Sequence, residues 1–237
     1  MNILWIILII VGCAILFSIV LSIASFSSER FIEVYNEYSN LYVKDLNILD
    51  FIHNLNHNKF NNKIVITQVE KDIDNFYVPS KKTVALSKKT LTSSSIASFA
   101  IVAHEMGHAL QDIEGNKLKT LNFLRRLGKL VGFLFMPLLI AGLIMLFFES
   151  VFTIALILLS LSVGILFLAI LIKAITISIE KDASKKGLVF LKDLLSEKDL
   201  NGCRKILNSA RLTYWGDLFR LLFSWTLLTR KTKMFRR

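Results

Sequence analysis

The sequence contains few of the residues that crosslink or break up a soluble fold. Among its 237 residues are 2 cysteines, 2 prolines and 10 glycines. Cys13 lies in an apolar run and Cys203 in a basic stretch, which excludes a small secreted domain held together by disulfides. The low glycine count and the absence of a repeat exclude a collagenous or low-complexity chain. Charged residues make up only 20% of the sequence, and its many apolar residues exclude a disordered chain.

Apolar sequence is what the chain has in abundance. Hydrophobic residues make up 54%, including 18 phenylalanines, and the mean hydropathy is +0.55. Three runs without a charge, residues 3–26, 130–148 and 151–172, are each long enough for a helix across a hydrocarbon core of about 30 Å. No Lys or Arg precedes the first run, which is longer than the apolar core of a signal peptide, so we expect an uncleaved anchor. Only Glu149 and Ser150 separate the other two runs, which predicts a transmembrane hairpin.

A fourth segment, residues 212–228, carries Asp217 and Arg220, so spanning, re-entrant and interfacial placements all stay open. The net charge of +11 comes from basic residues that flank the apolar runs, which is typical of proteins beside anionic lipid. Aromatic and basic residues are not interleaved on a soluble scaffold, so the charge does not indicate nucleic-acid binding.

The polar region between the first two runs predicts short helices and strands. Residues 29–52 have a helical pattern interrupted near Ser39 and Asn40, and the Asn-rich residues 54–62 indicate a loop or a frayed helix end. Hydroxyl side chains in residues 92–95 can cap a helix that continues to about Ile113 and stops at Gly115. A strand is expected at 63–69, and a hairpin from 76–78 and 83–86. The fold class is therefore mainly α: a multi-pass membrane protein with a small β-hairpin or sheet.

The capped helix contains the motif His104-Glu105-Met106-Gly107-His108, an H-E-x-x-H pattern. Side chains at i and i+4 lie one above the other on a helix, so both imidazoles can bind one Zn²⁺. Glu105 lies about 100° round the helix and can reach a water at the metal as a general base. Gly107 leaves space beside the metal for a substrate or a neighbouring helix.

His53 and His57 have the same spacing, but no acid occupies the position of the base. Asn54, Leu55 and Asn56 lie between them, so a solvated loop is favoured over a second metal site.

A catalytic zinc needs a third protein ligand and an open position. Cys13 lies in the membrane and Cys203 has no distinguishing context, so a carboxylate is favoured. Glu180 lies on the helical continuation of the third apolar run, about 12 Å beyond Ile172. A charge at the edge of the membrane, without a metal, is the plainer alternative for Glu180.

The chain resembles the YugP-like family of bacterial membrane zinc metallopeptidases and, more broadly, HtpX-like and CAAX-processing proteases. This resemblance implies that Glu180 is the third ligand, since it begins a Glu-x-x-Ala element in which Ser184 replaces the aspartate of the broader pattern. It also implies one Zn²⁺ per chain, a gluzincin-type site and a peptide or membrane-protein substrate. The similar stretches are residues 77–79, 83–87, 103–111, 136–139, 180–184 and 205–214.

Two parts of the chain depart from the family pattern. The family often has an Asp-His-Tyr-Asp-Pro-like run where this chain has Asn75-Phe76-Tyr77-Val78-Pro79, so roles of those polar side chains do not transfer. Residues 29–62 match poorly, and their role stays open.

The resulting hypothesis is a membrane-embedded zinc endopeptidase with Glu105 as its base. A strand edge near Val84 is expected to pair with the substrate backbone. Tyr214, Asn208 and Arg211 are candidate oxyanion or substrate contacts, although helix packing for the tyrosine and lipid contact for the arginine are plainer roles. The expected division of the chain is a transmembrane anchor at 1–28, a peptidase region at 29–129, a transmembrane hairpin at 130–172, and a third-ligand helix with a membrane-associated C-terminal helix at 173–237.

The sequence also allows two other classes of function. A catalytically silent membrane scaffold braced by zinc is the alternative, although a structural site needs no base at Glu105. A transporter is disfavoured because the apolar runs contain few polar residues. Lys and Arg are frequent in residues 27–129 and 173–211 and absent from the Glu149-Ser150 turn, which predicts an active site on the cytoplasmic side of a bacterial cell membrane. Substrate specificity and oligomeric state stay open.

Overall fold

The computed structural model describes residues 3–70 and 74–222, which form two compact units. Among these residues, one unit comprises 3–29, 123–176 and 213–222, and the other comprises 30–70, 74–122 and 177–212. The end of the segment 212–228 and the basic C-terminal tail lie outside the described residues.

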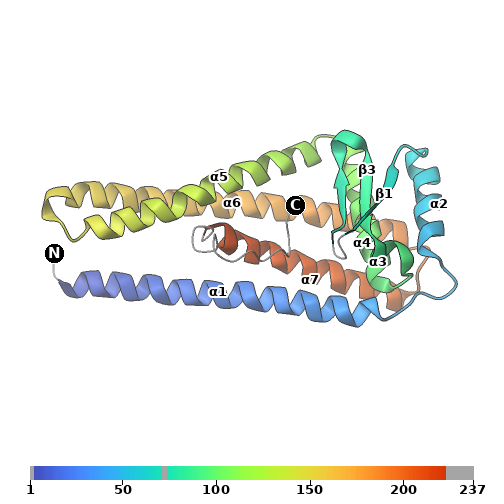
Figure 1. Ribbon diagram of the computed structural model, residues 1–237, viewed down its shortest axis with the longest axis horizontal. Coiled ribbons are helices and arrows are strands. Elements are labelled where there is room, and N and C mark those ends of the chain that lie inside the picture. The colour runs from blue at the N-terminus through green and yellow to red at the C-terminus, as the bar shows by residue number, and fades with distance from the viewer. Residues whose placement is uncertain (1–2, 71–73, 223–237) are drawn as a thin grey trace. The chain divides into compact units, whose positions relative to one another are not determined.

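The first unit consists of helix segments. It contains the beginning of α1 (Ile3–Ser39), most of α5 (Lys117–Met145), the first part of α6 (Phe152–Leu191) and the end of α7 (Glu197–Leu222). The short 3-10 turn Glu149–Val151 joins α5 to α6, and these two helices form the expected hairpin (Figure 1). Within the described residues, two helical stretches are long and apolar enough to cross a membrane, Lys117–Met145 and Glu149–Leu191.

The second unit contains a three-stranded sheet of β1 (Val65–Val69), β2 (Phe76–Val78) and β3 (Thr83–Ser87), in the order β1-β3-β2. The expected hairpin is confirmed, because β2 pairs antiparallel with β3 through the 3-10 turn Pro79–Lys81. Strand β1 adds to the other side of β3 in parallel.

The expectation of a strand edge near Val84 was wrong. Val84 is fully buried in the central strand, where it lies opposite Ile66 of β1 and Tyr77 of β2. Both sides of β3 are therefore occupied, and no substrate backbone can add to it.

Helix α2 (Ile48–Phe60) continues through most of residues 54–62, where a loop or a frayed helix end was expected. Ile48, Phe51, Ile52 and Leu55 lie at helical spacing and are buried, while the asparagines and histidines that suggested a loop cover the other face. The side chain of Asn47 caps the helix by accepting a hydrogen bond from the backbone N–H of Leu49.

Helix α4 (Ile96–Glu114) confirms the expected capped helix and packs against β2 and β3. Ser95 is its N-cap and accepts a hydrogen bond from the N–H of Ser98, and Gly115 ends it. The short helix α3 (Lys88–Thr92) precedes it. Phe99 anchors α4 in the core, with its ring 5.4 Å from the ring of Phe51 in α2. The sheet, α2, α3 and α4 lie together in Figure 1, and α4 places the H-E-x-x-H motif inside this unit.

Candidate metal centre

Helices α4 and α6 approach each other closely where they cross, because small residues face one another. A Cβ atom added to Gly107 would overlap the carbonyl oxygen of Ala183, and one added to Gly187 would overlap that of Ala103. Each helix therefore presents an alanine and a glycine four residues apart, on one face. Gly107 makes room for a neighbouring helix, which is one of its two expected roles.

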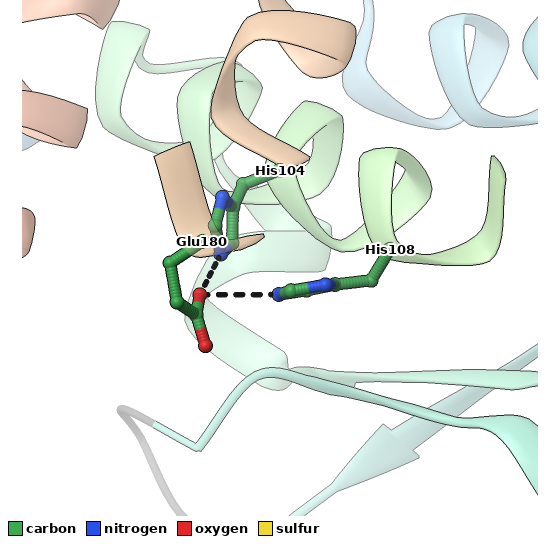
Figure 2. A group of neighbouring side chains, drawn as sticks. All are labelled: His104, His108 and Glu180. Carbon is green, nitrogen blue, oxygen red and sulfur yellow. Dashed lines mark ion pairs between the residues drawn. The ribbon is translucent and has the colours of Figure 1, made fainter. Parts of the chain in front are cut away.

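This crossing brings together His104 and His108 from α4 and Glu180 from α6 (Figure 2). The Nε2 atoms of His104 and His108 lie 3.4 and 3.3 Å from Oε2 of Glu180. The potential ligand atoms are all within 4.8 Å of one another. The side chain of Glu180 is 2% exposed and those of His104 and His108 are 12% and 4% exposed, so the cluster is largely shielded from water.

The hydrogen bonds of Gln111 determine which nitrogen of His108 carries the proton. Nε2 of Gln111 donates to the carbonyl oxygen of Ile179 at 2.9 Å and to Oδ2 of Asp182 at 2.8 Å. Because both partners can only accept, the amide oxygen must face Nδ1 of His108, at 3.0 Å. Nδ1 is then the donor, and Nε2 of His108 directs a lone pair toward Glu180.

Ser184 has the same effect on His104. Its hydroxyl donates to the carbonyl oxygen of Glu180 at 3.0 Å, which leaves its lone pairs to accept from Nδ1 of His104 at 3.1 Å. The Nε2 atom of His104 is therefore also a lone-pair donor toward the cluster.

Two imidazole nitrogens and one carboxylate oxygen thus face one another in a buried cluster. Because all three atoms are electron-rich, the cluster is stable only with a positive charge between them. Burial alone would raise the pKa of Glu180, but without a metal the positive charge of His108 and His104 in their protonated form outweighs it and holds that pKa well below its ordinary value. Nε2 of His108 is buried and has no hydrogen-bond partner among the residues that the structure describes. Two neutral imidazoles and a carboxylate form a ligand set that suits Zn²⁺ and leaves a fourth position for water or substrate. The residues present therefore fit the metal that the sequence predicts.

The other candidate residues lie elsewhere. Glu105 is buried in α4, at 2% exposure, beside the first histidine. Asn208 is exposed and Arg211 half-buried on α7, and within the described residues neither is hydrogen-bonded or ion-paired to the cluster. Tyr214 belongs to the other compact unit, where Lys173 lies 5.2 Å from the centre of its ring. Roles for these three in substrate contact stay predictions.

Val84 is buried in the sheet and is not a substrate contact on a strand edge. His53 and His57 lie exposed on α2, and the metal-binding group found among the described residues does not include them.

Sequence reasoning missed Gln111. It lies three residues after His108 and on the same face of α4, so the spacing that identified the ligands also points to it. A glutamine at that distance carries no chemical signature of its own, and its role becomes visible only when α6 is packed beside it.

Comparison with known proteins gives two matches. The family model described as "Putative neutral zinc metallopeptidase" matches residues 4–229. The "Putative membrane protease YugP" of Bacillus subtilis (strain 168) is 28% identical over 167 residues, which cover 67% of this chain and 70% of that protein. No solved structure matches the chain.

Proposed function

Because the chain belongs to the YugP-like family of neutral zinc metallopeptidases, we propose that it is a membrane-embedded zinc endopeptidase. His104, His108 and Glu180 would hold one Zn²⁺ per chain in a gluzincin-type site. The observation that supports this most directly is the meeting of the three side chains. Two come from the H-E-x-x-H helix α4, and the third, more than 70 residues further along the chain, comes from α6. Such a buried group with fixed imidazole tautomers is a suitable zinc site.

When bound, Zn²⁺ supplies Lewis acidity that activates a water and polarises the scissile carbonyl. The chain's own contribution to the reaction is then proton transfer. Glu105 accepts the proton of the attacking water and delivers it to the leaving amine, so that hydrolysis gives a carboxylate and an amine. Glu105 follows His104 on α4 and is buried at 2% exposure, so it lies next to the proposed metal ligands and is shielded from solvent.

The membrane part of the proposal concerns the three apolar runs. We place residues 3–26, 130–148 and 151–172 across the bilayer of a bacterial cell, with the zinc site on the cytoplasmic side. Large apolar side chains along α5 and α6 are exposed, for example Phe133, Phe167 and Val163 at 50%, 64% and 65%, which suits contact with lipid. The substrate would be a peptide or another membrane protein.

The test compares the wild type with Glu105→Gln in the full-length protein. Metal analysis should find about one Zn²⁺ per chain in both, because Glu105 is not a ligand. Cleavage of a peptide library should fall by at least ~100-fold in the variant, since general-base catalysis contributes about that much or more.

The alternative function is a catalytically silent scaffold that zinc braces. It predicts zinc in both proteins and no cleavage by either. Equal cleavage by the wild type and Glu105→Gln would contradict the proposed mechanism in a different way, by removing Glu105 as the base.

A further inference from the structure

We propose that Gln111 is a positioning residue for His108 and that Asp182 acts on this histidine through the Gln111 amide. The proposal deepens the zinc site proposed above and rests on it. In this arrangement the amide side chain of Gln111 bridges a carboxylate of α6 and a proposed metal ligand of α4.

The contacts form one continuous series from α5 through α6 to α4. Lys117, the first residue of α5, lies 3.0 Å from Oδ2 of Asp182, and the same oxygen accepts from Nε2 of Gln111. The amide oxygen of Gln111 then accepts from Nδ1 of His108. A metal-binding histidine commonly donates its second N–H to a carboxylate or carbonyl, which fixes the ring and makes it a better ligand. Here the carboxylate of Asp182 acts indirectly, because the Gln111 amide lies between it and His108.

Burial makes these hydrogen bonds costly to lose. Gln111 is 1% exposed and His108 is 3% exposed, so water cannot replace a lost partner. The Gln111 amide makes three hydrogen bonds. Its two N–H groups donate to Asp182 and to the carbonyl of Ile179, and its oxygen accepts from His108. Neither the amide nor the ring of His108 can turn without breaking a buried hydrogen bond.

The two histidines are therefore supported differently. His104 donates to a neutral hydroxyl, that of Ser184, which in turn donates to the backbone carbonyl of Glu180. His108 donates to an amide that has a charged pair behind it, Asp182 with Lys117. Among the described residues, a carboxylate therefore supports Nδ1 of the second histidine, through an amide, and not Nδ1 of the first.

The experiment measures zinc affinity of the full-length protein by competition with a chelator. Gln111→Leu should weaken zinc binding by about 10- to 100-fold, the range for outer hydrogen-bond partners of metal ligands. Asp182→Leu should weaken it less, whereas Asp182→Asn should stay near the wild type because the amide oxygen of Asn can still accept from Gln111. The double variant Gln111→Leu/Asp182→Leu should bind zinc no more weakly than Gln111→Leu alone, since both changes interrupt one path.

The matched control is Glu114→Gln. Glu114 pairs with Lys186 and so also joins α4 to α6, but neither contacts a histidine. This variant should keep the wild-type affinity. Equal losses in Glu114→Gln and Gln111→Leu, or additive losses in the double variant, would mean that the contacts only hold the helices together and would overturn the proposal.

A second measurement needs no variant. With only four histidines in the chain, ¹⁵N imidazole spectra of histidine-labelled, zinc-loaded protein can be assigned. His108 should carry its proton on Nδ1, and a proton on Nε2 would overturn the proposal. If the wild type binds no zinc, the proposed function fails. If it binds zinc and Gln111→Leu binds it equally well, only the positioning role fails.

Discussion

Glu180 and Asp182 lie two residues apart on α6, yet they meet different partners. Two residues correspond to about 200° round a helix, so both carboxylates cannot face one point. Glu180 faces the two histidines, whereas Asp182 accepts hydrogen bonds from Gln111 and Lys117. Burial favours the neutral form of Asp182, but its bonds to Gln111 and Lys117 lower its pKa below the ordinary value.

This difference gives the first residue-scale prediction. Glu180→Gln should weaken zinc binding by more than the ~100-fold that loss of an outer partner costs, because it removes the only anionic ligand. Asp182→Asn is the matched control and should stay near the wild type. Both are measured by chelator competition. A large loss in Asp182→Asn with normal binding by Glu180→Gln would show that α6 presents its other face to the metal.

Cys203 gives the second prediction at this scale. Its thiol is fully buried on α7, and desolvation, with a smaller contribution from Asp199, raises its pKa from 9.0 to about 12. In a Cys13→Ala background, an alkylating reagent at pH 8 should therefore react only after unfolding.

The raised pKa also has a consequence for stability. The folded state holds the Cys203 proton more tightly than the unfolded state, so its contribution is present below pH 9 and is lost as the pH rises from 9 toward 12. The free energy of unfolding should fall across this window by at most about 1.4 kcal/mol per pH unit from this group. Denaturant titrations of the wild type and Cys203→Ala should differ by this slope, and parallel curves would contradict it.

At the scale of elements, the crossing of α4 and α6 determines the site. The ligands of α4 are four residues apart and would line one helix face in any protein with this motif. Glu180 reaches them only because Ala103, Gly107, Ala183 and Gly187 let the two backbones touch. The metal site therefore depends on residues without functional groups.

Gly187→Ala tests this dependence. The added methyl group would overlap the carbonyl of Ala103, so the helices must separate, at a cost of about 1–3 kcal/mol. We expect a lower unfolding temperature and weaker zinc binding. Gly164→Ala, on the same helix, meets nothing within 4 Å and should be neutral or slightly stabilising. Wild-type zinc affinity in Gly187→Ala would show that the close approach is dispensable.

The sequence allowed good prediction of those parts of the molecule whose pattern is local. The cap at Ser95 and the stop at Gly115 bound α4, and the family resemblance of the Glu-x-x-Ala element pointed to Glu180, which the structure places beside both histidines. The place of β3 in the centre of the sheet could not be predicted, because its second partner, β1, pairs in parallel from more than ten residues away. The part of helix α2 after Ile52 was not predicted as regular helix, because its asparagines hid the helical spacing of its buried face.

The whole molecule raises the question of which side of the membrane the zinc site faces. The α5–α6 hairpin returns the chain, so residues 27–129 and 173–211, which contain all the proposed ligands, lie on one side if both helices cross. Lys and Arg are frequent in both stretches and absent from Glu149 and Ser150 at the turn. The positive-inside tendency therefore predicts that the ligands face the cytoplasm and the turn faces the outside, with more weight on 173–211 because it is the shorter stretch.

Cysteine labelling in intact cells decides this orientation. The single-cysteine variants Ser150→Cys and Val189→Cys, in a Cys13→Ala/Cys203→Ala background, place thiols at exposed positions at the turn and near the ligands. Val189 is 67% exposed, whereas the neighbouring Phe190 packs on Phe60 and would be a poorer choice. A membrane-impermeant maleimide should label position 150 in intact cells and position 189 only after permeabilisation. Labelling of position 189 but not of 150 in intact cells would place the site outside, where secreted proteins and the outer faces of membrane proteins, rather than cytoplasmic segments, would be its substrates.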